Sequence, residues 1–203
     1  MNSSYIQFFL ISLIFICFSS YAMNPTEKSK INYVIRPGNA QDRDNLKLLY
    51  RQVAAIPGGL ARTADEITDD YIDKILANAL TKGLIFVAEY NGQLIGSLLK
   101  YKLEPKVFAH VLSEGSILVH PDFQGSGIGT NLFLALFKEL EEHRPDIYRV
   151  EIVARESNPA IKLYERLGFK KEGRFEGRIK NSNGSFEADI PMAWFNKSFK
   201  PNA

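Results

Sequence analysis

The stretch Pro121-Asp122-Phe123-Gln124-Gly125-Ser126-Gly127-Ile128-Gly129-Thr130 lies between an apolar run at 116–119 and a long amphipathic segment. It places glycines at three alternate positions, where a strand-like sequence gives way to a helix-like one. Glycine lowers local stability because it loses more backbone freedom on folding than any other residue. The stretch therefore indicates either a tight turn alone or a turn against which a ligand lies.

Glycines at the start of a helix can bind a phosphate without any cationic side chain. They leave unpaired backbone N–H groups exposed, and the helix dipole adds positive potential at the same end. The spacing here is G-x-G-x-G, whereas a dinucleotide-binding turn has G-x-G-x-x-G and a nucleotide-hydrolase phosphate loop has Gly-Lys-Ser/Thr. Taken alone, the turn leaves both interpretations open.

The composition is that of an ordinary globular protein. A chain of 203 residues is long enough for one domain with a sizeable core. The net charge of +2 and the lack of a basic cluster argue against nucleic acid as a partner. The 3 histidines have no metal-ligand spacing, so we expect no metal site.

The amino-terminal residues differ from the rest of the chain. Residues 8–18 are apolar except for Ser12, and no charged residue precedes Glu27. Such a run is too short to span a bilayer but fits the core of a secretory signal, so we expect no stable membrane insertion of the folded domain. An alternative is that translation starts at Met23. We expect a leader at 1–22 and a single domain at 23–203, cytoplasmic if Met23 is the start and exported if the leader is a cleaved signal.

Hydrophobic periodicity and turn residues predict the order β-α-α-β-β-β-α-β-α-β-β. Asn91-Gly92 predicts a hairpin. Thr63 and Glu66 form a capping-box pattern and predict a helix from there to about Thr81. Strands are expected at 31–36, 84–90, 93–103, 109–119, 148–154, 169–178 and 186–194, and the other helices at 42–54, from 128, and at 159–167. The fold class is α/β (an α+β mixed sheet), mostly antiparallel, with helices on both faces.

Two segments resemble the GCN5-related N-acetyltransferases, the GNAT family. Residues 124–129 resemble its Gln/Arg-x-x-Gly-x-Gly/Ala signature, and 158–169, Asn-Pro-Ala-Ile-Lys-Leu-Tyr-Glu-Arg-Leu-Gly-Phe, resemble its second signature. The resemblance runs from about Tyr33 to Trp194 and implies the family fold. It also implies that the pyrophosphate of acetyl-coenzyme A, the co-substrate, is bound by Gln124, Gly125, Ser126, Gly127, Ile128, Gly129 and Thr130.

The same resemblance implies further contacts with the coenzyme. The pantetheine arm is expected to pair with the fourth strand, through main-chain groups of Ile117 and Val119. Asn158 is expected to bind the arm, although it is also a good N-cap for the helix that follows.

The resemblance implies two proton-transfer residues, and each has a structural alternative. Tyr164 matches the tyrosine that protonates the departing thiolate, but an aromatic residue on this helix could equally pack into the core. Glu114 is the candidate general base, and an exposed strand glutamate is its alternative. The only cysteine is Cys17, in the leader, which excludes an acetyl-cysteine intermediate in the domain and favours direct attack by the amine.

The implied function is transfer of the acetyl group of acetyl-coenzyme A to a primary amine in a ternary complex. The acceptor would be a small-molecule or peptide amine: a protein N-terminus, an amino acid or another small amine. A second hypothesis is a non-catalytic module that senses acyl-coenzyme A. The fold does not choose among acceptors, and the sequence leaves a homodimer open.

Overall fold

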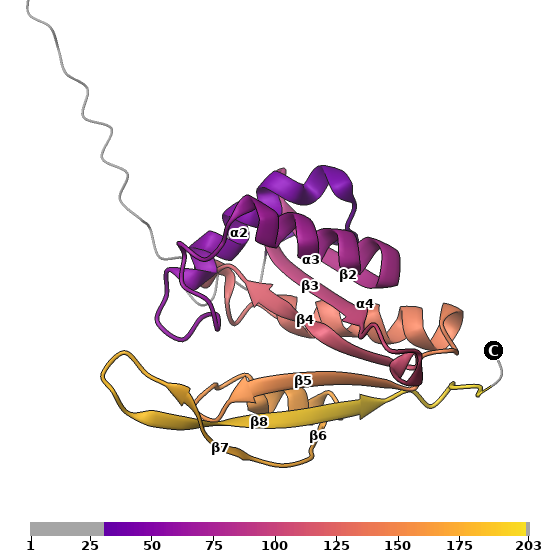
Figure 1. The fold of residues 1–203 in the computed structure, drawn as a ribbon. Coiled ribbons are helices and arrows are strands. Elements are labelled where there is room, and N and C mark those ends of the chain that lie inside the picture. The colour runs from indigo at the N-terminus through magenta and orange to yellow at the C-terminus, as the bar shows by residue number, and fades with distance from the viewer. Residues whose placement is uncertain (1–30, 202–203) are drawn as a thin grey trace, which may run out of the picture.

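The computed structural model describes residues 31–201, and the predicted leader lies outside the described residues. One 8-stranded sheet has the order β1-β2-β3-β4-β5-β8-β6, with β7 paired to β8 (Figure 1). The strands are β1 (Val34–Pro37), β2 (Gly83–Tyr90), β3 (Gln93–Lys102), β4 (Val111–Val119), β5 (Arg149–Arg155), β6 (Lys170–Lys171), β7 (Phe175–Lys180) and β8 (Phe186–Phe195). The α-helices are α2 (Arg43–Ala54), α3 (Asp69–Lys82), α4 (Ile128–His143) and α5 (Ile161–Arg166). The predicted fold class is confirmed.

Every strand pair is antiparallel except β4 with β5, which is parallel. The predicted hairpin joins β2 to β3. Asn91 and Gly92 have φ values of 50° and 76°, as a two-residue type I′ turn requires. This turn accounts for the antiparallel pairing of β2 with β3.

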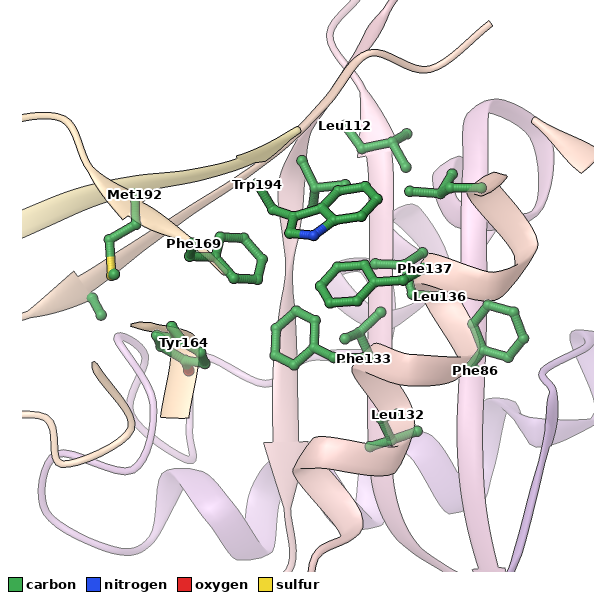
Figure 2. Close-up of a cluster of buried hydrophobic side chains, with 14 of the residues drawn as sticks. Phe86, Leu112, Leu132, Phe133, Leu136, Phe137, Tyr164, Phe169, Met192 and Trp194 are labelled. Carbon is green, nitrogen blue, oxygen red and sulfur yellow. The ribbon is translucent and has the colours of Figure 1, made fainter. Parts of the chain in front are cut away.

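Helices cover both faces of the sheet (Figure 1). On one face α2 and α3 bury a cluster that includes Leu46, Leu49 and Ile72 against β2, β3 and β4. On the other face α4 packs on β1, β2, β3 and β4, and it shares a second apolar cluster with α5, β5 and β8. Figure 2 shows the centre of this second cluster, where the rings of Phe137 and Trp194 stack with centroids 4.2 Å apart. The sheet is thus held between two separate apolar layers.

The predicted helix start at Thr63 is wrong. Glu66 does accept a hydrogen bond of 2.8 Å from the backbone N–H of Thr63, but the contact closes an isolated turn. The chain then buries Ile67 completely, and α3 begins at Asp69, where the hydroxyl of Thr68 caps it by accepting from the N–H of Tyr71. Burial of Ile67 therefore takes precedence over the local capping pattern.

The predicted strand at 169–178 is divided into β6 and β7. The interruption lies opposite Pro191 on β8, which has no N–H to donate to a neighbouring strand. The carbonyl of Pro191 still accepts a hydrogen bond of 2.9 Å from the N–H of Glu172. The long β7–β8 arm that results (Figure 1) contributes Arg178, Lys180 and Asp189 to the lining of a cavity described next.

Candidate active site

The parallel strands β4 and β5 pair only at their first residues. Val111 lies opposite Arg149 and Leu112 opposite Val150, and no further β4–β5 pair is formed within residues 31–201. Two cavities, of about 600 and 640 Å³, lie along the part of β4 beyond this pairing. Both are lined by Gly58, Gly59, Ile117, Asn158 and Tyr164. We call the first the turn cavity, after the glycine turn that lines it, and the second the arm cavity, after the β7–β8 arm that lines it.

The turn cavity is lined by the glycine stretch. Gly125 and Gly127 have φ values of 80° and 85°, in the left-handed region that favours glycine. A Cβ at either position would meet no protein atom within 4 Å, so the side of the backbone where a side chain would lie faces open space. Among the residues predicted to bind the pyrophosphate, those lining this cavity are Gln124, Gly125, Gly127, Ile128, Gly129 and Thr130.

Helix α4 begins immediately after this turn. The N–H of Asn131 donates to the carbonyl of Gly127, closing the first helical turn. The N–H groups of Ile128, Gly129 and Thr130 precede that bond and have no partner inside the helix. Together with the helix dipole they form an anion-binding end that opens into the turn cavity.

Two polar side chains of the stretch stabilise the turn itself. The Nε2 of Gln124 donates a hydrogen bond of 3.3 Å to the carbonyl of Val119, and the Oγ of Ser126 donates to the carbonyl of Phe123. Ser126 does not line the turn cavity. In this structure its side chain therefore fixes the loop geometry, whereas the neighbouring glycines face the cavity.

The edge of β4 that faces away from β3 carries the main-chain groups of Ile117 and Val119. The backbone N–H of His120, the residue after β4, donates to the carbonyl of Ile95 at 2.9 Å, which makes His120 and Ile95 a hydrogen-bonded pair that extends the β3–β4 ladder. Since such pairs alternate along antiparallel strands, Ile117 and Val119 direct their N–H and C=O groups away from β3. These groups therefore face the gap that β5 leaves.

Tyr164, on α5, lies where the two cavities meet. Its ring packs edge-on against Phe133 and Phe169, with centroids 5.7 and 6.0 Å away (Figure 2). Only 7% of the residue is exposed, and burial raises the pKa of its hydroxyl to about 12. Tyr164 thus belongs to the core and also lines both cavities. Packing in the core therefore does not remove it from the candidate site, and its role as a proton donor stays a prediction.

Asn158 both caps a turn and lines the two cavities. Its Oδ1 accepts a hydrogen bond of 2.9 Å from the N–H of Ala160, and its carbonyl accepts from the N–H of Ile161 at 3.1 Å. Helix α5 begins at Ile161, two residues later than predicted, so the Asn158 side chain caps the turn that leads into the helix. Capping uses only the amide oxygen, and the residue lines both cavities.

Glu114 lies on β4 and lines the arm cavity. Its side chain is exposed, and it also borders a smaller hollow next to Lys74 and Tyr101. The following residue, Gly115, has a φ of 123°, and a Cβ there would lie 2.1 Å from the carbonyl oxygen of Leu99. This irregular backbone sets the direction of Glu114 and requires glycine beside it.

Lys100, which the sequence analysis did not single out, is buried at the arm cavity. Only 4% of the residue is exposed, and its Nζ donates a hydrogen bond of 2.6 Å to the carbonyl of Ser113. Burial lowers the pKa of Lys100 to about 8, although Glu114 and Glu151 act in the opposite direction. The available signal was a lysine directly after the run 94–99, which is apolar except for Gly96 and Ser97, in a strand expected to be buried.

Two further findings concern the part of the chain that the structure describes. Within it, no group of 3 or more His, Cys, Asp or Glu side chains could hold a metal ion. Among the same residues, no helix has the length and apolar character needed to cross a membrane.

Comparison with known proteins identifies relatives of this chain. The model of the Acetyltransferase (GNAT) family matches residues 57–169, more than half of the chain, from the Pro57–Gly59 loop to the end of the second signature. The chain is 34% identical over 88 residues to acetyltransferase ECA0875 of Pectobacterium atrosepticum, a match covering 43% of this chain. It is 37% identical over 82 residues, 40% of this chain, to the UPF0157 protein YqkA of Bacillus subtilis. The matches span 57% and 21% of the lengths of these two relatives.

The fold is also similar to solved structures. One of them is yncA from Salmonella typhimurium, solved with its cofactor acetyl-CoA. The TM-score is 0.65 at 20% sequence identity, and the alignment covers 82% of this chain and 95% of yncA. Similarity at this identity concerns the fold, and the family assignment rests on the matching family model. The chain belongs to the GNAT family of acetyltransferases.

Proposed function

We propose that this protein transfers the acetyl group of acetyl-coenzyme A to a primary amine, with both substrates bound at once. The observation that carries the proposal is the meeting of the turn cavity and the arm cavity at Ile117 and Tyr164. One cavity would hold the coenzyme and the other the amine, so the reacting atoms would meet between them. Alignment of two bound substrates can supply much of the rate in such a reaction.

The turn cavity has the chemistry that the coenzyme requires. The backbone N–H groups at the start of α4 would bind the pyrophosphate, with Gly125, Gly127 and Gly129 allowing close approach. Main-chain groups of Ile117 and Val119 would pair with the amide groups of the pantetheine arm as an added strand would. The amide nitrogen of Asn158 would donate to the same arm, since its oxygen is used in the turn. That yncA binds acetyl-CoA supports this assignment.

The proton transfers would be divided between two residues. Tyr164 would donate its proton to the sulfur that leaves, because its raised pKa keeps the hydroxyl protonated over the physiological range. Glu114 would accept the proton of the amine, directly or through water, from its exposed position on the arm cavity. No cysteine lies in residues 23–203, so direct attack by the amine is the route we propose.

Two measurements test the proposal. Calorimetry with acetyl-coenzyme A should show binding, and a panel of amino acids, peptides and polyamines should release free coenzyme thiol with at least one amine. Binding without release for any amine would favour the non-catalytic sensor of acyl-coenzyme A. Failure to bind the coenzyme would overturn both hypotheses.

A further inference from the structure

The arm cavity carries an excess of positive charge. Its charged lining residues are the cations Lys100, Arg155, Arg178 and Lys180 and the carboxylates Glu114 and Asp189. Arg155 comes from the end of β5, and Arg178 and Lys180 from β7. These three cations therefore approach from the side of the cavity opposite β4.

Arg155 lies close to the meeting point of the two cavities. A Cβ at Gly58 would lie 3.8 Å from its Nη1, so the guanidinium rests against a loop that lines both cavities. Its own carbonyl accepts a hydrogen bond of 2.9 Å from the N–H of Asn158, another residue of both linings. An anion bound by Arg155 would therefore lie next to the place proposed for the reaction.

Within residues 31–201, the polar partners of the guanidinium groups of Arg155 and Arg178 lie 3.4 Å or more away. Arg155 Nη1 lies 3.4 Å from the Oδ1 of Asn181 and 3.6 Å from Glu187 Oε2, while the other oxygen of Glu187 accepts from the N–H of Ser157 at 2.7 Å. Arg178 Nε lies 3.7 Å from Asp189 and its guanidinium lies over the ring of Phe175.

Two arginines away from the cavity are paired more closely. Arg149 and Arg43 reach Glu172 and Asp69 at 2.6 Å. A separation of 3.6 Å is too long for a hydrogen bond, and a guanidinium fork binds a carboxylate best through two parallel bonds of about 2.8 Å. The two cavity arginines therefore have donors left for a ligand.

We propose that the acceptor is an amine with a carboxylate on the same carbon, an α-amino acid, and that Arg155 and Arg178 bind the carboxylate. This inference rests on the acetyl transfer proposed above. With the carboxylate bound by Arg155, the amine on the adjacent α-carbon would point to Ile117 and Tyr164. A peptide N-terminus has an amide in place of that carboxylate and would offer no anion to the donors that Arg155 and Arg178 have left.

Matched ligands test the inference independently of turnover. Free coenzyme A would be bound first, and each of several α-amino acids would then be titrated against the corresponding amino acid amide by calorimetry. The acids should bind about ten- to a hundredfold more tightly, the range for a charge-assisted pair. In turnover, kcat/KM corrected for the fraction of neutral amine should show the same preference. Equal affinity for acids and amides would overturn the inference.

Variants locate the preference in the cavity. Arg155→Gln and Arg178→Gln should each reduce the ratio of acid to amide affinity toward one. Arg174→Gln is the matched control, because Arg174 pairs with Glu156 at 2.7 Å and does not line the arm cavity, and it should keep the wild-type ratio. An unchanged ratio in Arg178→Gln, whose exposed side chain makes misfolding a minor concern, would contradict the assignment even if Arg155→Gln does not fold.

The outcomes also separate this inference from the proposed function. Acetylation of peptides or amides without a preference for α-amino acids would overturn the carboxylate site and leave acetyl transfer intact. Failure to bind acetyl-coenzyme A would overturn both.

Discussion

The Nζ of Lys100 on β3 donates a hydrogen bond of 2.6 Å to the main-chain oxygen of Ser113 on β4. Ser113 follows Leu112, the last residue of β4 that pairs with β5. The lysine therefore supplies a hydrogen bond next to the point where strand pairing ends. Its charge is buried at the base of the arm cavity, where Glu114 and Glu151 partly compensate for the lost hydration.

This buried charge predicts a pH dependence of stability. Burial lowers the pKa of Lys100 from 10.5 to about 8. Below pH 8 the lysine is charged in the folded and the unfolded chain, so the cost of burying the charge is present in full. Between pH 8 and 10.5 the unfolded chain binds more protons than the folded one, so the lysine's contribution to the free energy of unfolding rises with pH, by up to about 1.4 kcal/mol per pH unit.

Urea unfolding of wild type and Lys100→Met between pH 7 and 10 measures this contribution. The difference in the free energy of unfolding, wild type minus variant, should be constant below pH 8 and increase above it. A difference that is flat across the whole range would mean that Lys100 titrates near its ordinary pKa.

We predict that a side chain at Gly127 weakens coenzyme binding, whereas the same side chain in a turn outside the site does not. Gly127→Leu places a side chain in the turn cavity, so affinity for acetyl-coenzyme A should fall by about a hundredfold. Gly92→Leu is the control. Gly92 has a φ of 76°, close to the 85° of Gly127, and in both positions a Cβ meets no protein atom within 4 Å.

Both substitutions should therefore cost about 1–2 kcal/mol of stability from the left-handed backbone, whereas only Gly127→Leu should affect calorimetric binding. Equal affinities in the two variants would remove the turn from the coenzyme site.

The sequence predicted those elements of the fold and of the site that are local. The glycine turn, the hairpin at Asn91-Gly92 and the segment around Tyr164 depend on residues close together in the chain, so short patterns are sufficient. Lys100 and Arg155 were missed because their positions depend on distant strands. The direction of Lys100 follows from the path of β4 past Gly115, and Arg155 lies against a loop almost 100 residues earlier in the chain.

Tyr164→Phe separates the packing of the ring from the chemistry of its hydroxyl. The ring contacts with Phe133 and Phe169 remain, so stability and coenzyme affinity should change little. Turnover should fall by about ten- to a thousandfold if the hydroxyl protonates the thiolate, a range at or somewhat below that for loss of one general acid. Steady-state release of coenzyme thiol measures the effect, and wild-type turnover in the variant would leave Tyr164 as a core residue alone.

Glu114→Gln tests the base and gives a different pH profile. The substitution keeps the shape of an exposed side chain, so folding should be unaffected. If Glu114 accepts the amine proton, the variant should be slow at neutral pH and recover as pH rises, because a larger fraction of the amine is then already neutral. The defect of Tyr164→Phe should not recover in this way, since alkaline pH supplies no acid. If instead both variants keep full turnover from pH 6 to 9, neither residue transfers a proton, and catalysis rests on the alignment of the two substrates along β4.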